Sequence, residues 1–332
     1  MPTLLSKKYA LIAIILVAIL IPLLSTNEYY LHILTLSFIW IIAVYGLNLL
    51  AGFTGYLSLA HAGFFGIGAY ALGLLTVKGG MSFWPAFFLA PVITTVIGFF
   101  IGLVALRTKE HFFAIYTLCV GYIIYLVIDK WEGLTGGVRG LIGIPGPTNI
   151  GPIELTSANA RYYFVLTVLL LVVFLIYRIV NSLVGRSFIA IRNDEQLAQS
   201  IGISTLKNKL MSFVLSTFFA GLAGALYASF IRFIGPDISN INITFDLLIF
   251  MIVGGIGTLS GPVIGTLLIV VLSQQLQFLQ DHRMLIFGPL LTSIIIFSPR
   301  GLAGMYLTWY YKRKAKKKAQ IQTDNASIGG DS

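Results

Sequence analysis

The chain has 332 residues, of which 57% are hydrophobic and only 10% are charged. Soluble domains carry about 25% charged residues, so this composition excludes a water-soluble globular protein. The formal net charge of +10 does not indicate nucleic-acid binding, because six of the basic residues lie between 312 and 318, directly after the last apolar run, where the positive-inside rule accounts for them.

Apolar runs long enough to cross a membrane follow one another along the chain. A helix of about 20 apolar residues crosses a hydrocarbon core about 30 Å thick. We therefore expect an all-α, polytopic integral membrane protein with about ten transmembrane helices and a short cytoplasmic helix. The expected spans are 9–25, 31–51, 55–77, 83–105, 112–129, 162–183, 209–231, 241–256, 259–279 and 284–299. The run 241–256 is short and either spans or re-enters the membrane.

The distribution of basic residues predicts the orientation of these spans. With the N-terminus inside, ten spans place sixteen basic residues on the cytoplasmic side and six on the outer side, which agrees with the positive-inside rule. The outer six are Lys78, Lys130, Arg139, Arg161, Arg232 and Arg283. We expect a multi-pass protein of the inner (plasma) membrane with both termini in the cytoplasm. The membrane domain covers 1–311, and a basic, then polar, disordered cytoplasmic tail covers 312–332.

The segment Gly46 to Tyr70 carries a glycine or alanine at nearly every third or fourth position. Small residues let membrane helices approach closely, and polar side chains can hydrogen-bond between the helices. The run Gly52-Phe53-Thr54-Gly55 also favours an unwound backbone at a cavity. The polar side chains here either link helices or contact a transported molecule. The candidates for a translocation path are Asn48, Ser58, His61, Gly63, Gly66 and Gly68. A weak echo relates Gly55-Tyr56-Leu57-Ser58 to Gly257-Thr258-Leu259-Ser260.

Glycines and prolines are dense between Lys130 and Ala160, which predicts an ordered, turn-rich outer loop and no helix. The loop is either a connector or a docking element for an external partner, and it is long for a passive connection.

A second polar segment, Gly185 to Gly202, lies on the expected cytoplasmic side. Asn193 can cap a helix there, Asp194 and Glu195 place negative charge at its N-terminus, and Gly202 can end it. The expected helix has about two turns, with Leu197, Ala198 and Ile201 on one side. So short a helix must pack against something: its own bundle, lipid headgroups, or the groove of a partner protein.

Missing motifs narrow the classes of function. Ionisable residues within spans mark proton relays, and only Asp246 lies plausibly within an expected span, where a cap or packed polar group is the more common role. No Gly-Lys pair occurs, so the phosphate-binding loop of an ATPase is absent. The four histidines are scattered and Cys119 is the single cysteine. We therefore expect no enzyme, no catalytic residue, no metal site and no cofactor bound by this chain.

Several patches together resemble one known family, the branched-chain amino acid ABC permeases of the LivM type. They are Gly46–Tyr70, Thr135-Gly136-Gly137 to Ile144-Pro145, Gly185–Ala228, Val253–Pro262 and Ser298-Pro299-Arg300-Gly301-Leu302. They occur in the family's order from Gly46 to Gly304, which is more specific than any single motif. The basic tail matches nothing that the family requires.

The resemblance implies a set of partners. A family member pairs with a second, related permease, two cytoplasmic ATPase subunits that use ATP and Mg²⁺, and an extracytoplasmic substrate-binding protein. It works by alternating access. The resemblance also implies that the inner segment couples the permease to an ATPase subunit, through Gly185, Arg186, Ile191, Arg192, Asn193, Asp194, Glu195, Leu197, Ala198, Ile201 and Gly202. Ile191, Leu197, Ala198 and Ile201 are expected to fill the partner's groove, with Arg186, Arg192, Asp194 and Glu195 at its rim.

The transported molecule is expected to be a branched-chain or related amino acid. Family members also carry urea and short amides, and the patches do not discriminate among these. Outside the family, a stand-alone secondary transporter would use Asp246 or unwound backbone carbonyls as an ion site. A membrane enzyme would need clustered His, Asp or Glu at one membrane face, and the sequence has no such cluster.

Overall fold

The structure of the protein is a computed structural model. The structure describes residues 16, 18–23, 27–108, 110–149, 155, 157–275, 301–302 and 304–305. The expected span 284–299, most of the span 9–25 and the tail 312–332 lie outside these residues.

Long apolar helices dominate the described part of the chain. Five of them are long and apolar enough to cross a membrane: Glu28–Thr54, Phe83–Ala105, Phe112–Lys130, Ala158–Val180 and Thr205–Ile231. They correspond to α2 (Glu28–Leu47) with its π-helical continuation η1 (Asn48–Thr54), α4 (Phe83–Ala105), α5 (Glu110–Lys130), α7 (Ala158–Val180) and α10 (Thr205–Ile231). These helices confirm five expected spans to within a few residues at each end, whereas a total of ten stays a prediction.

Shorter elements complete the described fold. They are α3 (His61–Gly73) with η2 (Leu74–Lys78), α6 (Glu132–Thr135), η3 (Gly137–Arg139), α8 (Leu183–Asn193), α9 (Glu195–Ser200), η4 (Pro236–Ser239), α11 (Ile241–Gly254) and α12 (Gly261–Gln275). Two short strands, β1 (Leu141–Ile142) and β2 (Phe233–Ile234), pair antiparallel with Leu141 opposite Ile234. The loop expected on the outer side therefore holds two short helical turns, α6 and η3, and a strand, where the glycine and proline content predicted turns and no helix.

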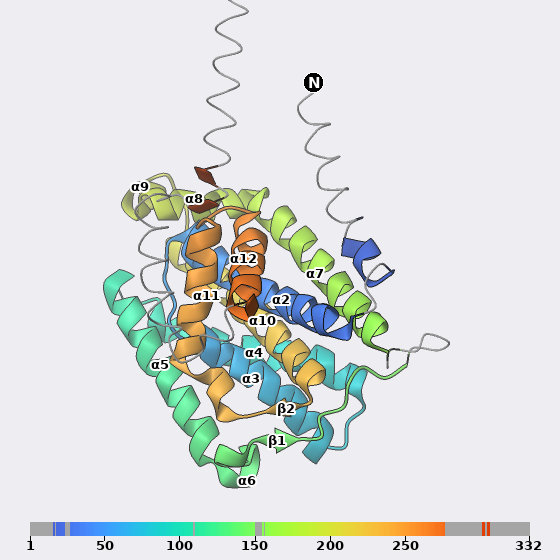
Figure 1. The fold of residues 1–332 in the computed structure, drawn as a ribbon. Coiled ribbons are helices and arrows are strands. Elements are labelled where there is room, and N and C mark those ends of the chain that lie inside the picture. The colour runs from blue at the N-terminus through green and yellow to red at the C-terminus, as the bar shows by residue number, and fades with distance from the viewer. Residues whose placement is uncertain are drawn as a thin grey trace, which may run out of the picture.

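Some helices are buried at the centre of the bundle, whereas others lie at its periphery and expose apolar side chains. In an 18-residue apolar stretch of Glu28–Thr54, 83% of the residues are buried, and in α10 61% are, against 33% in α4 and 28% in both α5 and α7. In Figure 1, α5 and α7 lie on opposite sides of the view with α2, α3 and α10 between them. The outer helices expose large side chains such as Phe88, Phe100 and Phe112. Such faces suit lipid and would be unfavourable in water.

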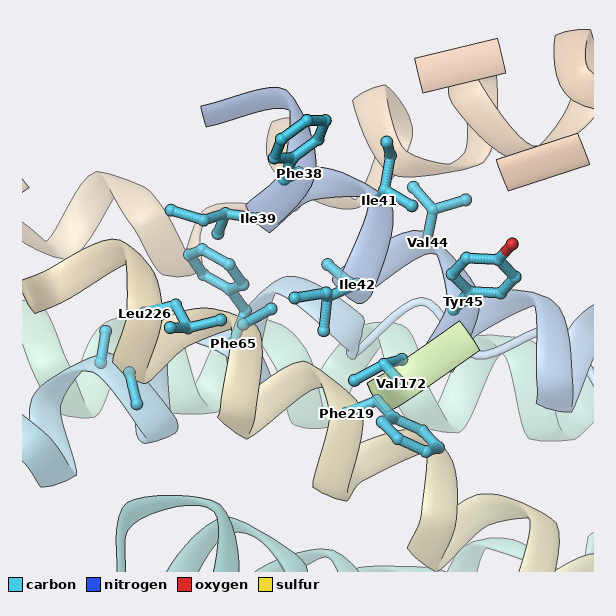
Figure 2. Close-up of a cluster of buried hydrophobic side chains, with 14 of the residues drawn as sticks. Phe38, Ile39, Ile41, Ile42, Val44, Tyr45, Phe65, Val172, Phe219 and Leu226 are labelled. Atoms are coloured by element: carbon cyan, nitrogen blue, oxygen red, sulfur yellow. The ribbon is translucent and has the colours of Figure 1, made fainter. Parts of the chain in front are cut away.

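The central helices pack through both large and small residues. Figure 2 shows Ile39 and Ile42 of α2 in one buried cluster with Phe65 of α3 and Leu226 of α10. Where α3 crosses α10, Gly68 lies directly against the backbone of Gly221, and a Cβ atom at Gly68 would come within 3.0 Å of it. Glycine thus permits the close helix approach that small residues give in membranes.

The helix expected over 55–77 begins later than the hydropathy pattern predicted. Residues 55–60 are not helical, and α3 begins at His61. The cause is local, because Gly55 has a left-handed φ of +88° and its N–H caps the preceding helix at the carbonyl of Leu50. Gly52, Phe53 and Thr54, which were expected to be unwound, still belong to η1, and the interruption is a non-helical linker of six residues, 55–60.

Candidate functional site

The polar segment at the end of the bundle contains two helices where the sequence analysis expected one. Its first helix, α8, is capped by Ser182, whose hydroxyl accepts a hydrogen bond from the N–H of Gly185. Gly185, Phe188 and Ile191 are buried at a spacing of three residues, so one face of α8 lies on the bundle. Ser182 and this spacing were the signals that the sequence analysis overlooked. Residues 183–202 are called the α8–α9 segment below.

The cap of the second helix, α9, is one residue later than expected. Asn193 is the last residue of α8, and Asp194 is the N-cap of α9. The Asp194 carboxylate accepts a hydrogen bond of 2.9 Å from the N–H of Leu197, while its extended backbone, with φ −161°, separates the two helices. The helix ends at Ser200, and Gly202 has a φ of +87°, which confirms the expected glycine at its C-terminus.

The apolar residues of the α8–α9 segment divide between two faces. Ile191 and Ala198 are each only 2% exposed and belong to a cluster within the chain's own bundle. The expectation that these two side chains fill a partner's groove is therefore wrong. Leu197 and Ile201 are 61% and 68% exposed. Leu183 and Ile189 are also exposed on α8. The face of the segment that points away from the bundle, called its free face below, is therefore apolar.

A partly buried ion pair joins α9 to α10, and Tyr56 of the non-helical linker 55–60 bonds to it. Nζ of Lys209 lies 2.6 Å from Oε1 of Glu195, and the Tyr56 hydroxyl donates to Oε2 of Glu195 at 2.6 Å. Lys209 also donates to the Tyr56 hydroxyl at 3.0 Å, with its Nζ 4.8 Å from the centre of the ring. Only 8% of the Lys209 side chain and 28% of the Glu195 side chain are exposed. Glu195, Lys209 and Tyr56 are called the Glu195 triad below.

The protonation of Glu195 is set by this triad. Partial burial favours the neutral carboxyl, but hydrogen bonds from Lys209 and Tyr56, with the charge of Lys209, outweigh burial and lower the pKa of Glu195 below its usual value. Glu195 is therefore ionised at neutral pH. Lys209 was expected only to be one of the cytoplasmic basic residues. Its position as the fifth residue of an apolar helix was a signal that it has a buried partner.

Two further polar side chains, Arg192 of α8 and Asn48 of η1, make hydrogen bonds at the interrupted helices. Nη1 of Arg192 donates a hydrogen bond to the carbonyl of Gly52, next to the break after η1. Asn48 is fully buried and binds the turn between α11 and α12, donating to the carbonyl of Thr258 at 2.9 Å and accepting from the N–H of Gly257 at 2.8 Å. Gly55 and Gly257, one from each segment of the weak sequence echo, both lie against Arg192. Both glycines have a positive φ.

The remaining candidates for a translocation path lie within the bundle. Nε2 of His61 pairs with the carbonyl of Ala43 at 2.9 Å, which joins α3 to α2. Ser58 is buried, and its hydroxyl has no hydrogen-bond partner among the described residues. The three glycines face different neighbours: Gly63 faces α5, Gly66 faces Ser239 and Gly68 faces α10. These contacts favour the interpretation of Asn48 and His61 as links between helices, and contact with a transported molecule stays a prediction.

In the part of the chain that the structure describes, no group of three His, Cys, Asp or Glu side chains is placed to bind a metal ion. The candidate site is instead a set of hydrogen bonds and an ion pair between helices. Arg192 and the Glu195 triad join a helix pair with an apolar free face to the places where the membrane helices are interrupted.

These features define an integral membrane protein whose helices are interrupted at a polar junction. The family model described as "Branched-chain amino acid transport system / permease component" matches residues 29–297. The chain therefore belongs to this family of permease components, as the sequence resemblance predicted. Membership agrees with a role in transport and with a position in the membrane.

Curated relatives agree with the family assignment. The chain is 30% identical over 321 residues to the "High-affinity branched-chain amino acid transport system permease protein LivM" of Salmonella typhimurium strain LT2, covering 90% of this chain and 75% of the relative. It is 24% identical over 291 residues to LivH of the same organism, covering 81% and 92%. It is 25% identical over 309 residues to the "Autoinducer 2 import system permease protein LsrC" of Yersinia pseudotuberculosis, covering 88% and 84%. No solved structure matches significantly.

Proposed function

We propose that the chain is the membrane-spanning permease subunit of an ATP-binding-cassette importer, which moves branched-chain or related amino acids across the inner membrane by alternating access. The observation that carries the proposal is the α8–α9 segment. One of its faces is bonded to the interrupted helices, and the other presents Leu197 and Ile201 to a partner. A short helix with an apolar free face suits the groove of another protein.

The contacts give a path for movement. A partner that displaces α9 also displaces Tyr56 through Glu195, and Tyr56 lies in the non-helical linker between η1 and α3. A partner that displaces α8 pulls on Gly52 through Arg192. Both contacts act on the same interruption, where the backbone lacks the hydrogen bonds that hold a regular helix together. Movement of the segment is thus passed to α2 and α3 together.

The proposed partners follow from this arrangement. ATP and Mg²⁺ are bound by two separate ATPase subunits, one of which holds the α8–α9 segment. The relatives LivM and LivH are both named as permease proteins of one type of system, which supports pairing with a second, related permease. An extracytoplasmic binding protein delivers the substrate. The segment lies in the cytoplasm, as do both termini.

Other cargoes and mechanisms remain as alternatives. The relative LsrC is named for import of autoinducer 2, so related permeases serve chemically different molecules. The greater identity to LivM than to LsrC favours an amino acid over autoinducer 2, and urea and short amides stay alternatives. A stand-alone secondary transporter would need no ATPase.

Uptake of labelled leucine tests the proposal. Cells without their own uptake system would produce the chain with its paired permease, ATPase and binding protein. We expect uptake that excess valine inhibits and excess urea does not. Replacing the phosphate-binding lysine of the ATPase is expected to reduce uptake at least tenfold, because ATP no longer drives the cycle. Full uptake with that inactive ATPase would contradict the proposal and favour a secondary transporter.

A further inference from the structure

A cavity of about 480 Å³ lies where the start of α2, the start of α7 and the end of α10 meet. Its lining includes Glu28, His32, Thr35, Arg161, Phe230 and Arg232. Helices α7 and α10 run from this cavity to the α8–α9 segment (Figure 1). Because α7 has 23 residues, the two sites are about 35 Å apart. The cavity is therefore at the opposite end of the bundle from the Glu195 triad.

Two arginines, Arg161 and Arg232, and one carboxylate, Glu28, line this cavity, so its lining carries a net charge of +1 with His32 neutral. Nε of Arg161 is buried and has no hydrogen-bond partner in the described part of the chain. A guanidinium offers five N–H donors in a planar fork, and a buried donor without an acceptor is unfavourable. The sequence analysis placed Arg161 and Arg232 on the outer side, where the positive-inside rule disfavours basic residues. A bound anion would account for both observations.

The backbone at Arg232 provides independent evidence. Arg232 has a φ of +62° and is the only residue other than glycine with a positive φ among those described. Its N–H caps α10 at the carbonyl of Ala228, and its own carbonyl accepts from the N–H groups of Gly143 and Ile144. A left-handed conformation is unfavourable for a residue with a side chain. Strain of this kind concentrates at binding sites, and Arg232 lines this cavity.

We propose that this cavity receives the carboxylate of a free amino acid on the outer side of the membrane, with Arg161 and Arg232 as its ligands. Arginine binds a carboxylate through paired hydrogen bonds. Leu31, Phe230 and Ile231 in the lining offer apolar surface to an aliphatic side chain. The volume lies in the range of about 300–1,000 Å³ that is typical of small-molecule sites. The inference rests on the proposed function, because it supposes that an amino acid enters from this side.

Thiol labelling of the assembled importer tests this assignment. His32 is exposed and lines the cavity, so His32→Cys provides a reporter once the exposed Cys119 has been replaced by serine. In right-side-out membrane vesicles, we expect an anionic methanethiosulfonate to react about tenfold faster than a cationic one, because charged clefts attract the opposite charge. Arg161→Gln together with Arg232→Gln should remove this preference. Arg139→Gln, an exposed outer arginine away from the cavity, should not.

Protection by ligands identifies the carboxylate. Leucine is expected to slow labelling of His32→Cys, whereas leucinamide, which lacks the carboxylate, is not. Equal protection by both ligands, no protection by leucine, or an anionic preference that survives loss of both arginines would overturn the assignment. Labelling reports binding and not uptake. A wild-type importer that takes up no leucine would therefore contradict the proposed function, and labelling would still decide on the cavity.

Discussion

Replacing Glu195 with glutamine is expected to uncouple ATP hydrolysis from transport. The change removes the carboxylate that ties α9 to Tyr56 and leaves the Lys209 ammonium, only 8% exposed, without its counter-charge. Leaving one partner of a buried ion pair uncompensated costs about 3–5 kcal/mol, and less here because Glu195 is partly exposed. In proteoliposomes, we expect the leucine transported per ATP hydrolysed to fall about tenfold, which corresponds to about 1.4 kcal/mol.

Two further variants separate coupling from stability. Adding Lys209→Met to Glu195→Gln removes the unpaired ammonium, so thermal stability should recover while coupling does not. Lys207→Met, at an exposed position on the same helix, should change neither quantity. Because the pKa of Glu195 is lowered, the pair is complete at neutral pH and is lost only in acid, as the pH falls through that lowered pKa. Wild-type coupling in Glu195→Gln would show that the triad does not transmit movement.

Replacing Gly68 with alanine is expected to prevent α3 and α10 from packing. A Cβ atom at Gly68 would lie within 3.0 Å of the Gly221 backbone, which has no flexible end to move aside. Overpacking of this kind costs about 1–3 kcal/mol, and more where backbones must separate. We expect the purified chain in detergent to unfold several degrees lower than wild type, or to aggregate during purification.

Gly133→Ala is the matched control for this change. Nothing lies within 4 Å of a Cβ atom at Gly133, and its φ is not positive, so its stability should equal that of wild type. Equal unfolding temperatures for Gly68→Ala and Gly133→Ala would contradict the close packing of α3 on α10.

The sequence predicted the long helices well because an apolar run of membrane length is directly visible. It predicted the break near Gly52 and Gly55 but not where α3 resumes. That point depends on contacts with distant helices, such as the hydrogen bond from the N–H of Leu59 to Thr117 of α5. The total number of spans remains an inference from hydropathy.

The candidate site was only partly predictable for the same reason. The α8–α9 segment was located from its polarity, but the inward faces of Ile191 and Ala198 depend on the bundle beneath them. The bond between Arg192 and Gly52 joins residues 140 positions apart, and no local pattern reveals it. Asn193 and Asp194 are both good capping residues, and only the backbone break at Asp194 distinguishes them.

Co-purification with the ATPase tests the central claim that this permease is driven through the α8–α9 segment. The test variant is Leu197→Asp with Ile201→Asp, whose side chains are 61% and 68% exposed. The control is Val138→Asp with Ile142→Asp, each 74% exposed in the outer loop. We expect the tagged wild type and the control to retain the ATPase, and the test variant to lose it while still inserting in the membrane. Retention of the ATPase by the test variant would contradict the account.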